Sequence, residues 1–270
     1  MGKSPSTIIV IPAFNESDSL PGVLDNLAQV VPEFDIVVVD DGSSDRTYDL
    51  AAAAGVHALK LPFNLGIGGA LRAGFRFAAE QGYERGVQFD ADGQHDANEI
   101  SVLLDELDQG ADLVIGSRFA GQGDYAVGRT RSAGMGLLRV AVRLLSGRRF
   151  SDTSSGFRAM SGQLLRQFAV DYPVEYMDST ETLISACRMG FDVREVPVTM
   201  HERAGGQPSN RNFRLFYNYA RLLVVLAASA RSKQPALQPV VSPSTILPTN
   251  SPASTPANTA ANTTVAEVRP

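Results

Sequence analysis

Two aspartates, Asp90 and Asp92, follow an apolar run that ends at Phe89. Carboxylate oxygens are the ligands that hard divalent cations prefer, and residues two apart on an extended chain point to the same side. Gly93 allows a sharp turn directly behind the pair. The spacing predicts a cation site for a diphosphate group. An acidic turn before the next helix is the alternative, and a calcium loop fits poorly because its sixth position needs Gly, where this chain has His95.

Short β-rich runs alternate with helical patterns through the first half of the chain. The runs occupy residues 7–11, 35–40, 56–61, 85–90 and 111–116, and the helical patterns lie near 17–30, 45–54, 67–81 and 97–109. This alternation predicts βαβ units, and therefore an α/β fold with a mostly parallel twisted sheet flanked by helices. Ligands of such open sheets bind beyond the carboxyl ends of the strands. The loops that follow the strands, the Asp90 segment among them, should therefore line one edge.

The second half of the chain is organised differently. Its pattern predicts a loop and basic helix over 119–148, a helix near 178–189, a strand near 192–200 and a last helix near 209–230. Beyond Arg231 the composition shifts to Pro, Ser, Thr, Ala and Asn, which cannot bury enough apolar surface to fold. We therefore predict one domain over residues 1–230 and a disordered tail over 231–270.

Charge is unevenly distributed along the chain. The net charge of −5 argues against a general nucleic-acid binder. Residues 1–117 carry 19 acidic and 6 basic residues, whereas residues 118–270 carry 10 acidic and 18 basic ones. Most of the basic residues are Arg, which suits bidentate phosphate contacts. The single Cys187 forms no internal disulfide, which fits a cytosolic setting.

The chain carries an ordered set of motifs over roughly residues 7–225. They are Ile11-Pro12-Ala13-Phe14-Asn15-Glu16, Val39-Asp40-Asp41-Gly42-Ser43, Asn64-Leu65-Gly66, Asp90-Ala91-Asp92-Gly93-Gln94-His95, Gly116-Ser117-Arg118, Ser155-Gly156-Phe157-Arg158 and Glu202-Arg203. Together they resemble the family-2 glycosyltransferases, and within them the dolichol- or polyprenyl-phosphate sugar (mannose) synthases. The resemblance implies a GT-A (nucleotide-diphospho-sugar transferase) fold. It also implies inverting transfer of a hexose from a GDP- or UDP-sugar to a polyprenyl (dolichyl or undecaprenyl) phosphate, for cell-envelope glycan synthesis.

The resemblance further implies a role for individual residues. It places Mg²⁺ or Mn²⁺ on Asp90, Asp92 and Gln94. It implies that the nucleotide sugar is bound by Pro12, Phe14, Glu16, Asp41, Asn64, Gly66 and Asp90. It implies that the acceptor phosphate meets Arg118, Arg131, Arg158 and Arg203, and that the catalytic group is Asp92, Arg118, Arg131 and Arg203. Phe14 stands where many relatives have Tyr, so a ring stack remains without the hydroxyl, and Arg129 is an alternative to Arg131.

A phosphate acceptor agrees with this charge layout. Its second pKa is about 6, so it is mostly ionised at neutral pH and needs no general base. Its difficulty is repulsion, because two unit charges ~4 Å apart repel by about 4 kcal/mol at an effective dielectric of ~20. A cation on the donor diphosphate and arginines on the acceptor offset that repulsion. Acidic loops followed by arginines are therefore the expected arrangement.

Other functions stay open at this point. A soluble glycosyltransferase acting on a saccharide or metabolite hydroxyl would need a base, for which Asp178 and Glu181 are candidates, although capping of their helix is equally consistent. A non-catalytic nucleotide-sugar binder is the distant alternative. Gly66-x-Gly68 imitates a dinucleotide fingerprint, but Leu71 replaces the third glycine. His95 is a candidate for a phosphate contact.

The C-terminal segment bears on location. The clean apolar run 222–230 is far shorter than the ~20 residues that span a bilayer. On the last helix Arg211, Arg214, Asn218 and Arg221 share one face, which favours an interfacial helix on an anionic membrane surface; packing on the core is the alternative. We expect a cytoplasmic enzyme, peripheral on the inner face of the membrane. As in some relatives, a small membrane partner protein would help it to dock.

Overall fold

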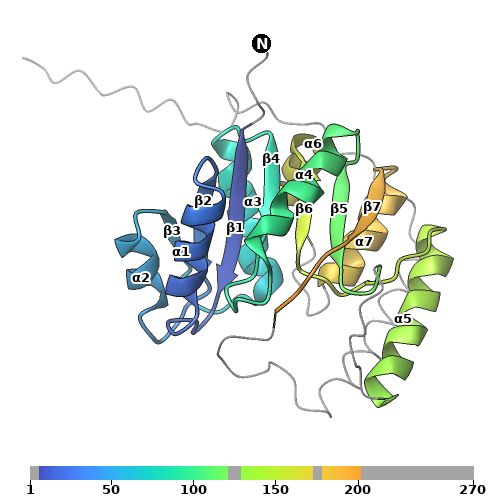
Figure 1. The fold of residues 1–270 in the computed structure, drawn as a ribbon, viewed down its shortest axis with the longest axis horizontal. Coiled ribbons are helices and arrows are strands. Elements are labelled where there is room, and N and C mark those ends of the chain that lie inside the picture. The colour runs from blue at the N-terminus through green and yellow to red at the C-terminus, as the bar shows by residue number, and fades with distance from the viewer. Residues whose placement is uncertain (1–5, 121–128, 173–177, 202–270) are drawn as a thin grey trace, which may run out of the picture. The chain divides into compact units, whose positions relative to one another are not determined.

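The computed structural model describes residues 6–120, 129–172 and 178–201. Within them a seven-stranded sheet lies between two layers of helices (Figure 1). The strands are β1 (Thr7–Ala13), β2 (Asp35–Asp40), β3 (His57–Lys60), β4 (Arg85–Gln88), β5 (Leu113–Ser117), β6 (Arg158–Ser161) and β7 (Val193–Pro197). The helices are α1 (Leu20–Val30), α2 (Thr47–Ala53), α3 (Ile67–Glu80), α4 (Ile100–Asp108), α5 (Arg129–Ser146), α6 (Gly162–Val170) and α7 (Asp178–Arg188), with a short 3-10 turn, η1 (Ala97–Glu99), before α4.

The sheet confirms the predicted α/β fold. Its strand order is β3-β2-β1-β4-β6-β5-β7, and β6 runs antiparallel to both of its neighbours while the other pairs are parallel. Strand β6 and helix α6 were not predicted. Strand β6 is only four residues long and begins with a charged residue, Arg158, so its composition does not resemble that of a buried strand. Helix α6 has a detectable signal, because the Ser161 hydroxyl caps it by accepting from the Leu164 N–H at 3.4 Å.

Both faces of the sheet are buried, as a largely parallel sheet requires. Side chains of β1 alternate between the faces, and Ile8, Ile9, Val10 and Ile11 are all fully buried. Helices α3, α5, α6 and α7 cover one face, where the buried Phe75 ring of α3 contacts Phe168 and Tyr172. Helices α1, α2 and α4 contribute to the core on the other face. This double layer fixes the strand ends, and with them the loops that carry the motifs.

The chain after β7 crosses to the Asp90 loop. The Val198 N–H donates to the Ser117 carbonyl at 3.1 Å, and the His201 N–H donates to the Gln94 carbonyl at 2.8 Å. His95 and Met200 form an isolated antiparallel bridge between these contacts. The described chain therefore ends beside the candidate cation loop. The predicted last helix, near 209–230, and the predicted tail, 231–270, lie outside the described residues.

No helix in the described ranges is long and apolar enough to cross a membrane.

Candidate active site

The loop that carries Asp90 and Asp92 follows strand β4. The strand ends at Gln88, and Ala91 and Asp92 lie in a turn. The prediction that an extended backbone points both carboxylates to the same side is therefore wrong. Gly93 does adopt the predicted left-handed conformation, with φ of 75°.

His95 is the point that both carboxylates share. Its Nε2 lies 3.5 Å from Asp90 Oδ2, and the charge of Asp92 acts on the pKa of the same imidazole. Asp90 therefore lies beside His95 at the carboxyl edge of the sheet, and Asp92 is close enough for its charge to act on the same ring. Convergence of the two carboxylates on one cation stays a prediction.

The His95 imidazole is neutral and buried. It stacks on Phe157, with 4.8 Å between ring centroids, and meets the Phe89 ring edge-on. The Asp90 backbone N–H donates to His95 Nδ1 at 3.1 Å, so the proton of the neutral ring lies on Nε2. Burial lowers the pKa of His95 to about 4, which keeps it uncharged at neutral pH. This placement makes His95 a support of the loop.

The residues present fit an open Mg²⁺ or Mn²⁺ site. The Gln94 N–H donates to Asp92 Oδ1 at 3.0 Å, which holds that buried carboxylate in place. Among the described residues no group of three His, Cys, Asp or Glu side chains forms a closed cation cage. Mg²⁺ commonly takes one or two carboxylates, with substrate phosphates and water completing the octahedron. A pair of carboxylates at a loop edge is the donor set of such a site.

Gly156 allows the chain before β6 to approach Asp90 closely. A Cβ at this position would lie 2.8 Å from Asp90 Oδ2 and 3.0 Å from Oδ1. Real Cβ atoms do not tolerate contacts this short, so any larger residue would displace the carboxylate or the loop. The Ser155-Gly156 segment therefore sets the position of Asp90.

We expect Gly156→Ala to weaken divalent-cation binding by about 10–100-fold, because it displaces a carboxylate through its supporting contact. A calorimetric titration with Mn²⁺ in the presence of nucleoside diphosphate measures the cation affinity. Gly136→Ala on α5 is the matched control, since its Cβ would meet nothing within 4 Å. Equal cation affinity in both variants would contradict the role given to Gly156.

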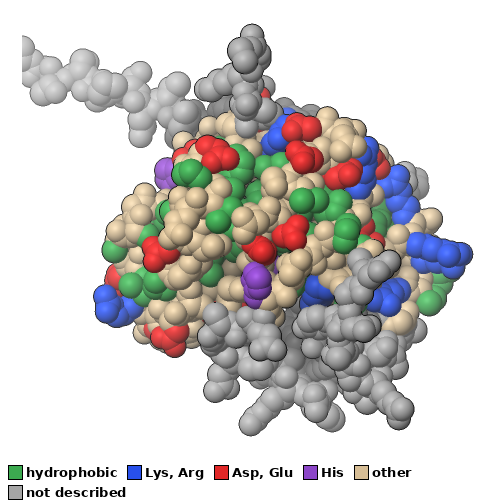
Figure 2. Space-filling model, in the orientation of Figure 1, with side chains coloured by type: hydrophobic (Ala, Val, Ile, Leu, Met, Phe, Trp, Pro, Cys, Tyr) green, Lys and Arg blue, Asp and Glu red, His purple; other side chains and the backbone are tan. Residues whose placement is uncertain are grey.

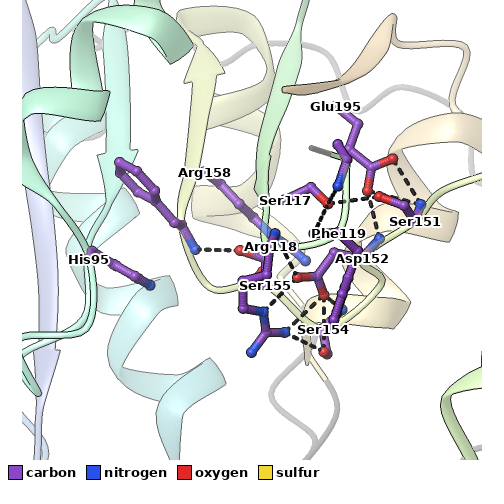
Figure 3. Close-up of polar contacts among 12 residues, drawn as sticks. His95, Ser117, Arg118, Phe119, Ser151, Asp152, Ser154, Ser155, Arg158 and Glu195 are labelled. Atoms are coloured by element: carbon purple, nitrogen blue, oxygen red, sulfur yellow. Dashed lines mark hydrogen bonds and ion pairs between the residues drawn. The ribbon is translucent and has the colours of Figure 1, made fainter. Parts of the chain in front are cut away.

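Arg118 follows strand β5 and is held by a buried carboxylate. Its Nε and Nη2 donate to Asp152 Oδ2 and Oδ1 at 2.7 and 2.9 Å, and Nη2 also donates to the Ser154 hydroxyl at 2.9 Å (Figure 3). Asp152 is fully buried, which alone would raise its pKa, but the bonds and charge of Arg118 outweigh burial and hold that pKa below its usual value. The charge of Arg118 also acts on His95. Arg118 thus lies near the cation loop, and its contact with an acceptor phosphate stays a prediction.

Arg158 is buried inside the domain, with 1% of its surface exposed. Its Nε donates to the Ser155 carbonyl at 2.9 Å, and its Nη2 donates to the Ser179 carbonyl at 2.7 Å. The predicted contact with an acceptor phosphate does not fit this placement, because the guanidinium is enclosed and two of its nitrogens are used. Arg158 instead links the loop before β6 to the first turn of α7.

On the nucleotide side, Asp41 organises the loop after β3. Its two carboxylate oxygens accept from the N–H groups of Leu65 and Gly66 at 2.7 and 2.8 Å. Burial raises the pKa of Asp41, with a further contribution from Asp40, while the two N–H bonds oppose the shift. The carboxylate therefore fixes Asn64-Leu65-Gly66, and its predicted contact with the nucleotide stays a prediction.

The loop after β1 carries the other predicted nucleotide residues. Pro12 is half-buried at the end of β1, and Phe14 is 46% exposed just beyond it, as a ring available for stacking would be. The Glu16 N–H donates to the Thr47 hydroxyl at 2.9 Å, and its Oε2 accepts from the Ser19 hydroxyl at 2.7 Å. Contacts with a base or ribose stay predictions for all three.

Sequence reasoning missed the residues that connect the first two loops. Asn15 has a positive φ of 55°, its N–H donates to the Ser43 hydroxyl at 2.9 Å, and its Oδ1 accepts from the Ser44 N–H at 2.9 Å. Asn tolerates the left-handed region better than most residues. An Asn directly after Phe14, in the loop that follows β1, was therefore the sequence signal for this turn. The Asn15 contacts hold the loops after β1 and β2 together.

Two predicted acceptor arginines cannot be placed. Arg131 lies on α5, but its side chain is outside the described part, and Arg203 lies beyond the last described residue. The described chain ends at His201, whose Nε2 is 3.4 Å from Asp96 Oδ2. Of the two candidate bases, Glu181 is half-buried on α7, and the side chain of Asp178 is outside the described part.

The fold and the carboxylate loop define a GT-A glycosyltransferase. Residues 8–172 match the family model described as Glycosyl transferase family 2, and the chain belongs to that family. It is 36% identical over 211 residues to an undecaprenyl-phosphate mannosyltransferase of Micrococcus luteus, covering 74% of this chain and 85% of that protein. It is 35% identical over 210 residues to a polyprenol monophosphomannose synthase of Mycolicibacterium smegmatis, covering 74% and 79%.

A solved structure shares the fold. Glucosyl-3-phosphoglycerate synthase from Mycobacterium tuberculosis, crystallised with Mn²⁺, UDP and phosphoglyceric acid, superposes with a TM-score of 0.64 at 23% identity, over 84% of this chain and 78% of that one. At this sequence identity, the likeness shows that the two proteins share a fold. The chain is thus a family-2 glycosyltransferase, and it resembles polyprenyl-phosphate mannose synthases.

Proposed function

We propose that this enzyme transfers a hexose from a GDP- or UDP-sugar to a polyprenyl phosphate, with inversion at the sugar C1. The observation that carries the proposal is that the carboxylate loop and the Arg118 loop meet at His95. His95 Nε2 lies 3.5 Å from Asp90 Oδ2, and its ring stacks on Phe157, whose carbonyl accepts from the Gly116 N–H at 2.9 Å, two residues before Arg118. Carboxylates suited to a cation and an arginine suited to a phosphate therefore lie at the same edge of the sheet. The two polyprenyl-phosphate relatives support this choice of acceptor.

The chain's own residues perform three tasks in this reaction. The loops after β1, β2 and β3, joined through Asn15 and Asp41, hold the nucleotide. Asp90 and Asp92 would hold a divalent cation, which when bound would supply positive charge to the departing nucleoside diphosphate. The arginine side of the site receives the acceptor phosphate, whose oxygen attacks C1 from the face opposite the diphosphate. That oxygen is already ionised, so no side chain has to remove a proton.

A direct assay tests the proposal. Purified protein is incubated with a panel of GDP- and UDP-hexoses and with vesicles that contain a polyprenyl phosphate, and the lipid is analysed by mass. We expect one hexose to be added to the polyprenyl phosphate and none to be added to the matching polyprenol. Transfer to phosphoglyceric acid or to a free sugar, with none to the lipid phosphate, would contradict it.

A hydroxyl acceptor is the second candidate, and one observation favours it. It would need a carboxylate base, and Glu181 is half-buried on α7, the helix whose first turn Arg158 holds through the Ser179 carbonyl. If the acceptor is a phosphate, Asp178→Asn and Glu181→Gln should each keep most of the transfer rate, whereas Arg203→Ala should lose most of it. An essential carboxylate together with a dispensable Arg203 would favour the hydroxyl acceptor. Initial rates with saturating donor distinguish the two.

A further inference from the structure

Strand β7 presents a half-buried carboxylate, Glu195, to the loop that precedes β6. Its Oε1 and Oε2 accept from the Ser151 N–H at 3.0 and 2.8 Å, and Oε1 also accepts from the Asp152 N–H at 2.6 Å (Figure 3). Hydrogen bonds to an ionised acceptor are stronger than those between neutral groups. Glu195 therefore fixes the backbone of two consecutive residues that lie 44 and 43 positions away in the chain.

The partners of Glu195 distinguish it from the carboxylates around it. Figure 2 shows most of the Lys and Arg side chains of its view gathered on the side of the molecule where Figure 1 shows β7 and α5. The neighbouring Arg194 pairs with Glu106 at 2.9 Å and with Asp192 at 2.9 Å. Within the described ranges Glu195 itself joins no ion pair, and its oxygens accept backbone N–H groups. Its contacts thus indicate a role in loop geometry.

The two residues that Glu195 fixes are the ones that hold the Arg118 loop. The Asp152 carboxylate accepts from Arg118 Nε at 2.7 Å and from Nη2 at 2.9 Å. The Ser151 hydroxyl lies 2.7 Å from the hydroxyl of Ser117, the residue directly before Arg118. A shift of the 151–152 backbone would therefore move both contacts at once. The path from Glu195 to the Arg118 guanidinium consists of hydrogen bonds throughout (Figure 3).

The cation end of the same segment has its own support. The Thr180 hydroxyl of α7 donates to the Thr153 carbonyl at 2.9 Å, in a contact that is buried. Further along, Gly156 is the residue whose close approach sets the position of Asp90. Residues 153–156 are thus held from α7, and residues 151–152 are held from β7 by Glu195. Loss of the Glu195 contacts should therefore disturb the arginine end of the segment and leave the cation end in place.

We propose that Glu195 is a positioning residue for the acceptor phosphate. It holds the 151–152 backbone so that the Asp152 carboxylate orients the Arg118 guanidinium before the acceptor arrives, and an oriented group binds without the cost of reordering. The proposal rests on the proposed function for the identity of the acceptor. It gives a role to a residue that lies outside every sequence motif and outside residues 8–172, which match the family model.

Steady-state kinetics with a short-chain polyprenyl phosphate test the proposal. Glu195→Gln keeps the size of the side chain but replaces one accepting oxygen with an NH₂ group. We expect it to raise the acceptor KM by about 10–100-fold, while the donor KM and the Mn²⁺ affinity stay at their wild-type values. The control is Glu106→Gln, which removes the same charge from a half-buried carboxylate that binds Arg194, the neighbour of Glu195. Equal changes in the donor and acceptor KM, or a wild-type acceptor KM, would overturn the proposal.

A second measurement needs no activity. In NMR of nitrogen-labelled protein the Arg118 Nε–H signal is assigned by its disappearance in Arg118→Lys, and its bond to Asp152 should make it exchange slowly with water. Glu195→Gln should lose the slow exchange, and Glu106→Gln should keep it. Slow exchange in both variants would show that Glu195 does not orient Arg118.

A second variant covers the case in which Glu195→Gln does not fold. Ser151→Ala keeps the N–H that Glu195 accepts and removes only the contact with the Ser117 hydroxyl. It should raise the acceptor KM by about 2–10-fold, the usual effect of one neutral hydrogen bond, and an unchanged value would overturn the proposal. Loss of slow Arg118 exchange in Glu195→Gln without any wild-type transfer to the lipid phosphate contradicts the proposed function alone. Wild-type transfer with both readouts unchanged in Glu195→Gln contradicts this inference alone.

Discussion

Asp92→Asn should lower glycosyl transfer by about a hundredfold or more, the scale expected when one preorganised charge is removed from a developing transition-state charge. Asn keeps an oxygen that accepts the Gln94 N–H, which lies 3.0 Å from Asp92 Oδ1, so the turn after Asp90 should remain. What disappears is the negative charge that holds the divalent cation on the diphosphate. Initial transfer rates over a range of Mn²⁺ concentrations, compared with wild type, measure the loss.

The control is an acidic residue away from the loop. Asp49 is exposed on α2, and Asp49→Asn removes the same charge from the chain without touching the site. We expect its rate and its cation requirement to match wild type. Excess chelator should abolish wild-type transfer, and added Mg²⁺ or Mn²⁺ should restore it. Full activity in chelator, or a wild-type rate in Asp92→Asn, would show that these carboxylates do not serve a cation.

The α/β fold was predictable because its strands are ordinary buried strands. The residues 8–11 and 36–39 at the centres of two of these strands are all apolar, and a helix separates the two strands in the chain. Strand β6 was not predictable in the same way. It begins with Arg158, a charged residue whose burial is tolerated because its guanidinium donates to the carbonyls of Ser155 and Ser179. The second partner is 21 residues away in sequence, and no local pattern shows it.

Sequence reasoning predicted where several motif residues lie, but only part of their contacts. Those from Phe14 to Arg118 lie at or just beyond the carboxyl ends of β1 to β5, because parallel strands bring these ends to one edge. The motif Ser155-Gly156-Phe157-Arg158 instead leads into β6, and Glu202-Arg203 lies outside the described residues. The sequence did not show that Asp41 binds the backbone of Leu65 and Gly66, or that Asp152 binds Arg118. These partners are 24 to 34 residues apart in the chain, so only the folded structure brings them together.

The pairing of Arg118 with Asp152 leads to the second large effect. Arg118→Met should lower the free energy of unfolding by about 3–5 kcal/mol, because it leaves the fully buried Asp152 carboxylate without its counter-charge. Urea unfolding measures this value. Arg76→Met is the control: Arg76 pairs with Glu80 on the surface of α3, with 66% of its side chain exposed, and such a pair contributes about 0–1 kcal/mol. Similar losses in the two variants would contradict the importance of the buried pair.

Acidification separates this ion-pair effect from a simple packing defect. In the wild type the pKa of Asp152 lies below its usual value, so the pair's contribution is complete above the unfolded pKa of about 3.9 and is lost as pH falls through the folded pKa. Without the Arg118 guanidinium, burial raises the pKa of Asp152 and is opposed only by the hydrogen bonds from Ser154 and from the backbone N–H of residue 118, so protonation destabilises the variant less than wild type. The stability difference between Arg118→Met and wild type should therefore shrink as pH falls toward 4 and below. A difference that does not change with pH would indicate lost packing around the arginine stem. Arg118 both stabilises the fold and is predicted to contact the acceptor phosphate. Its contribution to catalysis is therefore measured separately, as the acceptor KM and the kcat of Arg118→Lys under conditions in which this variant is fully folded.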